Sequence, residues 1–175
     1  MLKRVGAMVL VAVMALMCLA GCGGGNKAAE RDSFASQLYA AKNPYISNSS
    51  ANNELVQLTG AKSLGKYNLD IQDKKHPYTL SIRYMYLGND VDATSVETQL
   101  LYTSIIVLSL IDDCEQVNWS FPSDDGLKEG WVGIDYANEV AGMDIKKAAK
   151  DQESFTTLCD TLFPNEAVAQ TETQE

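Results

Sequence analysis

The segment from residue 99 to residue 111 contains no charged residue, and its apolar side chains fall on more than one side of a helix. Ahead of it, Thr94 and Glu97 have the spacing of a capping box, which predicts that a helix begins there. The uncharged run of 13 residues is too short to cross a bilayer, which takes about 20. We therefore expect a long helix that is buried on most sides in the core of a folded domain.

Two segments before this helix alternate between apolar and polar residues, as half-buried strands do. They cover residues 66–72 and 78–87, and the five residues DKKHP connect them. This arrangement predicts an antiparallel hairpin with its apolar side chains on one face. Those side chains are Tyr67, Leu69 and Ile71 in the first segment and Tyr78, Leu80, Ile82, Tyr84 and Tyr86 in the second.

Two further segments after the helix, residues 116–121 and 131–137, also have a strand pattern. The polar residues 122–130 between them predict a turn. The apolar faces are Val117, Trp119 and Phe121 in the first segment and Val132, Ile134 and Tyr136 in the second.

Helices are expected on both sides of these strands. Residues 33–43 predict a short helix, Ser49 or Ser50 can cap a second one, and residues 139–163 predict a last helical region that breaks near Asp151. The order of elements favours a single layered α+β domain, in which a mostly antiparallel sheet packs on a long buried central helix.

Residues 1–21 have the layout of a secretory signal peptide, because Lys3 and Arg4 precede an uncharged apolar run that ends in small residues. The run LAGC that ends at Cys22 resembles the bacterial lipobox, in which the cysteine is joined to a diacylglycerol and the chain is cut before it. Two acyl chains anchor a protein stably, whereas one chain does so only marginally. Cys22 is therefore predicted to hold the protein on the outer face of a bacterial cell membrane. An uncleaved membrane helix is the alternative, which the glycines of residues 21–25 disfavour.

Composition predicts the remaining boundaries. Residues 22–32 are the expected lipidated cysteine and flexible spacer, residues 33–163 the globular domain, and residues 164–175 a disordered tail. Removing residues 1–21 takes away two basic residues and no acidic one, so the formal net charge goes from −9 to −11. This charge disfavours nucleic acid and anionic lipid as partners of the domain.

Two cysteines, Cys114 and Cys159, remain in the domain. In an oxidising compartment they are candidates for a disulfide. Both lie in apolar helical contexts, where buried free thiols occur as well. The sequence leaves the two alternatives open.

No residue pattern points to catalysis through a histidine or a metal. His76 is the only histidine, and it lies in a loop before Pro77. A Ser-His-Asp or Cys-His site and a zinc site would each need it together with partners that the sequence does not place near it. We therefore predict no catalytic residue, no metal and no cofactor.

Acidic residues are the remaining candidates for chemistry. Residues 89–97 partly match a calcium loop but lack its central glycine, so a solvated loop explains them better. A pair of carboxylates can cleave glycosidic bonds when the fold spaces them correctly. The candidates for such a pair are Asp112, Asp113, Asp124 and Asp125.

Two loops that contain proline are the candidate binding sites. They are Asn43, Pro44 and Tyr45 in one loop and His76, Pro77 and Tyr78 in the other. Turn formation alone explains both, and a functional loop of this kind suits binding better than catalysis. The strand tyrosines are also able to line a groove for a sugar or a peptide, although packing across the strands explains them better.

Three segments together resemble the family called domain of unknown function 4825, which occurs in Gram-positive bacteria. They are residues 42–58, 66–86 and 100–121. The resemblance implies a domain that occurs as a lone lipoprotein, or attached outside the membrane to metallopeptidases of the antirepressor, antibiotic-sensing type. The chain has no His-Glu-x-x-His motif and no set of spanning helices, so nothing in it resembles the peptidase.

The expected function is a non-catalytic binding, sensing or accessory module of the cell envelope, carried by a lipid anchor. The expected partners are the membrane, through that anchor, and an envelope protein or a cell-wall ligand. The alternative is an envelope hydrolase, such as a glycan-cleaving enzyme, that uses the acidic residues between positions 112 and 125.

Overall fold

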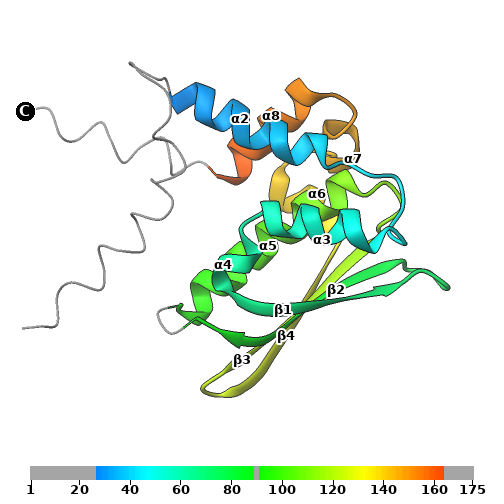
Figure 1. Cartoon of the computed structure of the whole chain (residues 1–175). Coiled ribbons are helices and arrows are strands. Elements are labelled where there is room, and N and C mark those ends of the chain that lie inside the picture. Colours follow the sequence, from blue (N-terminus) through cyan, green and yellow to red (C-terminus); the bar gives the residue numbers. More distant parts are fainter. Residues whose placement is uncertain (1–26, 89–90, 164–175) are drawn as a thin grey trace, which may run out of the picture. The chain divides into compact units, whose positions relative to one another are not determined.

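The uncharged segment forms the middle of α5 (Ala93–Leu110), a helix of 18 residues. The structure is a computed structural model that describes residues 27–88 and 91–163 (Figure 1). In α5, Val96, Leu100 and all residues from 103 to 110 are buried, which confirms the predicted central helix. The predicted signal peptide, Cys22 and the tail from residue 164 lie outside the described residues.

Length and composition alone would allow α5 to cross a membrane, and among the described residues it is the helix that passes this test. However, 56% of its length is buried inside the structure. A core helix passes the same test as a membrane span, and burial among helices and strands identifies α5 as a core helix.

The start of α5 differs from the prediction. Asp92 caps the helix, because its Oδ1 accepts hydrogen bonds from the backbone nitrogens of Thr94 (2.9 Å) and Ser95 (3.4 Å). Glu97 instead forms an ion pair with Lys128, at 2.7 Å between Oε1 and Nζ. The predicted capping box of Thr94 and Glu97 is therefore wrong, and the cap lies two residues earlier.

The described strands form one sheet in the order β1-β2-β3-β4. β1 pairs with β2 and β3 with β4 as antiparallel hairpins, whereas β2 and β3 pair in parallel. Parallel neighbours need a long crossover, and α5 provides it. The predicted α+β fold with a mostly antiparallel sheet is confirmed. The strands are β1 (Gly65–Gln72), β2 (Thr79–Leu87), β3 (Gln116–Ser123) and β4 (Gly126–Gly133).

The first hairpin follows the prediction except at its open end. Tyr67 pairs with Tyr84, but Lys66 pairs with Tyr86, which leaves Met85 as an extra residue in a bulge. The bulge shifts the alternation by one position. Tyr86 is therefore 58% exposed rather than on the apolar face.

The second hairpin begins at Gln116 as predicted, but its second strand begins and ends earlier than the sequence suggested. Ser123 pairs with Gly126, so the turn is only two residues long and residues 126–130 belong to β4. The predicted strand over residues 131–137 is wrong in its second half, because helix α6 (Ile134–Ala141) begins directly after Gly133. Ala137 and Ala141, four residues apart, form the buried side of that helix.

The remaining helices largely occupy the predicted regions. The break near Asp151 is confirmed, since the Asp151 Oδ1 caps α8 by accepting a hydrogen bond from the Ser154 nitrogen at 2.8 Å. Asn48, rather than Ser49 or Ser50, caps α3. The first described helix already starts at Lys27, inside the predicted spacer. These helices are α2 (Lys27–Ala40), α3 (Ser49–Leu58), α4 (Ala61–Leu64), α7 (Ile145–Ala148) and α8 (Gln152–Leu162).

The described helices lie on one side of the sheet (Figure 1). Strand β3 shows the consequence, because Val117 and Phe121 are fully buried against the helices while Asn118 and Ser120 lie on the other face. Trp119, on the covered face, lies over Gly130 of β4, where an added Cβ would be 2.1 Å from Cζ2 of the indole. The other face of the sheet is covered by no element that the structure describes.

A partly buried lysine, Lys146, holds the junction between α5 and β3, which comprises residues 111–115. The Lys146 Nζ of α7 donates hydrogen bonds to the carbonyl oxygens of Ile111 (2.7 Å), Asp112 (3.0 Å) and Cys114 (3.1 Å). Burial lowers the pKa of Lys146 from its usual value, and the nearby Cys114 and the carboxylates of Asp112 and Asp113 counteract that shift. The ammonium group thus links three carbonyls of the junction that follows the helix.

We predict that Lys146→Met destabilises the fold, because carbonyls of the junction lose their donor. The cost of leaving buried polar groups unpaired suggests a loss of about 1–3 kcal/mol in the free energy of unfolding. Lys147→Met is the matched control, since Lys147 is exposed and pairs only with Asp144 on the surface. Urea unfolding measures both. Equal losses for the two variants would contradict the role given to Lys146.

We also predict that Gly130→Ala destabilises the second hairpin, since the added Cβ would collide with the Trp119 ring. Overpacking of this kind costs about 1–3 kcal/mol. Glu129→Ala, at the neighbouring exposed position, is expected to stay within about 0.5 kcal/mol of the parent protein. Thermal unfolding followed by circular dichroism measures the difference, and an unchanged midpoint for Gly130→Ala would refute the packing of Trp119.

Candidate functional site

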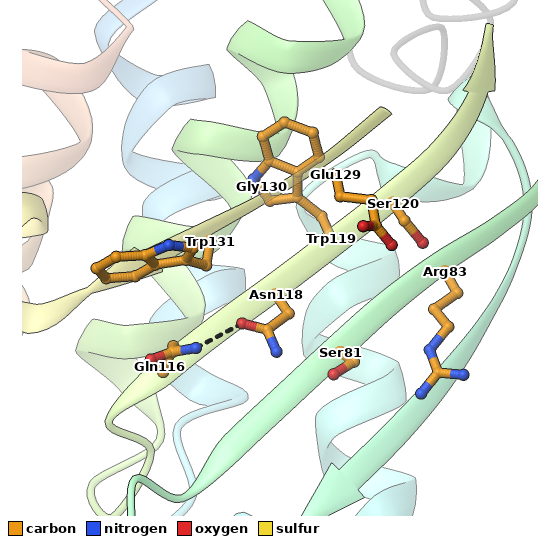
Figure 2. Close-up of a pocket in the computed structure, with 9 residues that line it drawn as sticks. All are labelled: Ser81, Arg83, Gln116, Asn118, Trp119, Ser120, Glu129, Gly130 and Trp131. Carbon is orange, nitrogen blue, oxygen red and sulfur yellow. Dashed lines mark hydrogen bonds between the residues drawn. The ribbon is translucent and has the colours of Figure 1, made fainter. Parts of the chain in front are cut away.

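The uncovered face of the sheet is hollowed by a shallow groove with a volume of about 350 Å³, here called the open-face groove (Figure 2). It crosses β2, β3 and β4, and most of its side chains are polar. The groove is lined by Ser81, Arg83, Gln116, Asn118, Trp119, Ser120, Glu129, Gly130 and Trp131.

Strand alternation explains why these side chains meet. On β3, Val117, Trp119 and Phe121 point to the helices, so Asn118 points to the open face. Asn118 pairs with Ser81 of β2 on one side and with Trp131 of β4 on the other. One row across three strands therefore carries a hydroxyl, an amide and an indole.

Trp131 is the large aromatic residue of this face, with 64% of its surface exposed. Its ring lies over Gly133, where an added Cβ would be 3.3 Å from Cζ3 of the indole. Figure 2 shows the ring beside Gln116 and Asn118. Because Gly133 has no side chain, nothing at this position separates the indole from the strand.

A hydrogen bond joins the side-chain amides of Gln116 and Asn118, which lie next to the indole. Gln116 Nε2 donates a hydrogen bond to Asn118 Oδ1 at 2.7 Å (Figure 2). This contact fixes the direction of the Asn118 side chain. Across the described chain, no hydrogen bond engages its Nδ2 group, which leaves a donor for a ligand.

The charges of the open face are nearly balanced. Arg83 Nε lies 3.2 Å from Asp70 Oδ2, and both side chains are more than half exposed. Glu129, opposite Ser120, adds a second carboxylate. The groove therefore combines polar and charged groups without a strong excess of either sign.

A second hollow, of about 440 Å³, lies on the other side of β4. It is lined mainly by residues of β4 and by side chains of α5 and α6, among them Leu101 and Tyr136. Trp119 of β3 also lines it. The Trp119 Nε1 is buried and has no hydrogen-bond partner among the described residues. The two hollows flank the same edge strand.

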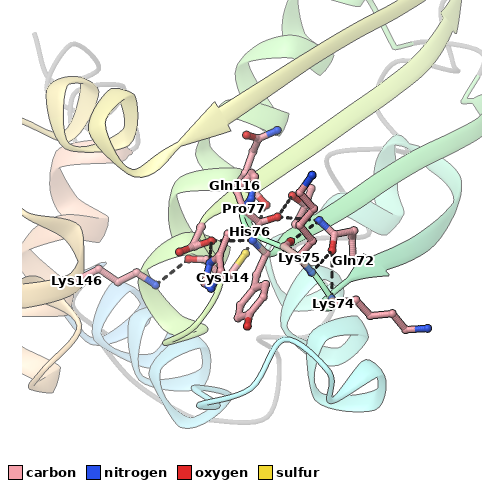
Figure 3. A network of polar contacts seen from close by, with 11 residues as sticks. Gln72, Lys74, Lys75, His76, Pro77, Cys114, Gln116 and Lys146 are labelled. Atoms are coloured by element: carbon pink, nitrogen blue, oxygen red, sulfur yellow. Dashed lines mark hydrogen bonds and ion pairs between the residues drawn. The ribbon is translucent and has the colours of Figure 1, made fainter.

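The predicted loop of His76, Pro77 and Tyr78 is held by Glu115 (Figure 3). Glu115 Oε2 accepts a hydrogen bond from the Tyr78 nitrogen at 2.8 Å and lies 2.8 Å from His76 Nδ1. The His76 and Tyr78 rings stack at 4.1 Å. Two hydrogen bonds lower the pKa of the Glu115 carboxyl. The bond with His76 has the larger effect, and the bond from the Tyr78 nitrogen has the next largest. Gln72 completes the network by donating to the carbonyls of Lys75 and Pro77.

The predicted loop of Asn43, Pro44 and Tyr45 is also held in place by the core. The Asn43 nitrogen donates to the Leu110 carbonyl at 3.0 Å, and its buried side chain donates to Asn52 Oδ1 at 3.3 Å. Its own Oδ1 accepts from the Tyr45 nitrogen at 3.2 Å. Tyr45 itself is 63% exposed. Neither loop lines the open-face groove, and both attach to the junction of residues 111–115 or the helix end before it.

The acidic candidates fall into two separate places. Asp113 Oδ1 accepts a hydrogen bond from the Ile46 nitrogen at 2.6 Å, and Asp112 lies 3.5 Å from Lys42 Nζ. Asp124 and Asp125 form the turn beyond the eight residues of β3. At about 3.3 Å per residue that strand spans roughly 25 Å, whereas paired glycosidase carboxylates lie about 5–9.5 Å apart. Over residues 27–88 and 91–163, no group of three or more His, Cys, Asp and Glu side chains is arranged to hold a metal ion.

Cys114 and Cys159 are free and buried in the structure, which corresponds to the second of the two alternatives. Burial raises the pKa of Cys114 to about 11 and that of Cys159 to about 12. Both side chains therefore remain protonated thiols near neutral pH, a form that is a poor nucleophile.

Trp131 was not among the residues that the sequence singled out. It was assigned to the start of a strand over 131–137, in which its side chain had no special position. The dipeptide Asp125-Gly126 is the available signal for a turn in this region, because Asp-Gly is frequent in tight hairpin turns. The turn residues in the structure are Asp124 and Asp125, one position earlier than a two-residue Asp-Gly turn, and the resulting register sets Trp131 opposite Asn118.

Comparison with known proteins gives a family. The sequence model of the family described as Domain of unknown function (DUF4825) matches residues 38–136, which is more than half of the 175 residues. The match includes both hairpins and α5 and ends inside α6. No curated protein and no solved structure matches the chain. The predicted resemblance is confirmed, and the chain belongs to the DUF4825 family.

Proposed function

We propose that this protein is a non-catalytic binding module of the cell envelope, and that the open-face groove is its binding surface. The observation that carries the proposal is the uncovered row of Ser81, Asn118 and Trp131, in which an exposed indole lies beside ordered hydrogen-bonding groups. Binding sites commonly combine an aromatic surface with a few polar groups that fix orientation. The anchor at Cys22 places this module on the outer face of the membrane.

The alternative of an acidic hydrolase finds less support. Asp113 holds the backbone of Ile46, and Asp112 pairs with Lys42, so both acids have structural partners. The groove contains one carboxylate, Glu129, and a glycoside hydrolase of the usual kind needs two. A binding role, unlike hydrolysis, requires no second carboxylate in the groove.

The anchor is tested by Cys22→Ala. We expect this variant to leave the membrane fraction and to appear in the soluble fraction or the medium, because an unlipidated chain lacks the two acyl chains that stable anchoring requires. Cys18→Ala is the matched control and is expected to stay with the membrane. Immunoblots of fractionated cells measure both. If Cys22→Ala stays membrane-bound, the lipid anchor is excluded.

The binding surface is tested by photo-crosslinking in intact cells. A benzophenone amino acid at Ser120, within the groove, is expected to give more adducts than the same residue at Glu153, which is exposed on α8. Benzophenone reacts with C–H bonds of proteins and glycans alike, so mass spectrometry also reports the class of partner. Equal or absent adducts at the two positions would refute the groove as a binding surface.

A further inference from the structure

Trp131 has the properties of a stacking platform for a sugar ring. Its indole is 64% exposed, and Gly133 beneath it removes the side chain that would tilt the ring away from the strand. The face of an aromatic ring carries a negative partial charge, and a pyranose ring offers polarised C–H groups on its apolar face. The two surfaces are therefore complementary in shape and in charge.

The groups around the platform suit sugar hydroxyls. A sugar hydroxyl can both donate and accept hydrogen bonds. The side-chain amides of Gln116 and Asn118 and the hydroxyls of Ser81 and Ser120 can do the same. Asn118 lies directly across from Trp131, and its orientation is set before any ligand arrives. A ligand that stacks on the indole thus meets ordered polar partners at its rim.

Charge selects the kind of glycan. Arg83 is already paired with Asp70, and Glu129 adds a negative group, so the groove offers no unpaired cation for a polyanion. The formal net charge of the chain, −9, also repels anionic polymers. The shallow groove of about 350 Å³ matches part of a chain rather than an enclosed small molecule.

We infer that the open-face groove binds an uncharged glycan, with Trp131 stacking against a sugar ring and Asn118, Gln116 and Glu129 bonding its hydroxyls. The inference rests on the proposed function and names its ligand class. An extended peptide is the competing ligand, but the open face presents few apolar pockets for peptide side chains.

The test uses the full chain in detergent micelles. The probe is immobilised chitin, an uncharged polymer of N-acetylglucosamine, and a soluble tetrasaccharide of N-acetylglucosamine serves as competitor. The parent protein is expected to be retained and to be displaced by the tetrasaccharide. Trp131→Ala is expected to bind about tenfold more weakly, which corresponds to about 1.4 kcal/mol.

Two variants serve as controls. Trp131→Phe keeps an aromatic face and is expected to bind more tightly than Trp131→Ala. Tyr45→Ala removes a similarly exposed aromatic residue outside the groove and is expected to bind like the parent protein. Circular dichroism of each variant shows whether it is folded.

A second measurement does not depend on the alanine variant. Acrylamide quenches exposed tryptophan, and Trp131 is far more exposed than Trp119, which packs against the core. The tetrasaccharide is expected to protect the emission of the parent protein from acrylamide and to leave the quenching of Trp131→Phe unchanged.

Absence of retention of the parent protein, or equal retention of Trp131→Ala, overturns the glycan inference. If Ser120 crosslinks to a protein in cells while the immobilised glycan does not retain the parent protein, the binding function stands and the ligand class is wrong. If Ser120 gives no more adducts than Glu153, the proposed function itself fails.

Discussion

The burial of α5 is the constraint on which the rest of the fold depends. The helix is apolar on more than one side, and its residues from 103 to 110 are buried without interruption. A sheet covers one side of such a helix, so other helices must cover the remaining sides. In this structure α3, α4, α6 and α7 contact α5 along with β3 and β4. Helices are thereby gathered on one face of the sheet, and no described element covers the other face.

The end of α5 determines what the proline loops do. Lys146 holds the junction after this helix, because its ammonium group donates hydrogen bonds to three of the junction's carbonyls. The same junction receives the backbone of Asn43 and, through Glu115, the loop of His76. These loops look distinctive in the sequence because they close the core. Their residues are explained by that structural role, which moves the candidate site to the open face.

The sequence predicted the parts of the fold in which apolar periodicity is strong. α5 and the first hairpin have a clear period, and their positions agree with the structure to within a few residues. β4 has glycine at Gly126, Gly130 and Gly133, so it lacks side chains at positions where alternation would be read. The strand was therefore placed too late, and the orientation of Trp131 could not be inferred. The bulge at Met85 was equally hidden, since bulges depend on pairing with the partner strand.

The glycines that hide β4 in the sequence also explain its two surfaces. Gly130 leaves room for Trp119 on the covered face, and Gly133 leaves room for Trp131 on the open face. Glycines of one short strand thus make room for Trp119, which packs against the core, and for Trp131 at the surface. A side chain at Gly130 would disturb packing, whereas a side chain at Gly133 would tilt the exposed indole and leave the core contacts of Trp119 in place. Under the proposed function, stability and binding therefore depend on different glycines of the same strand, so that the two properties can be changed separately.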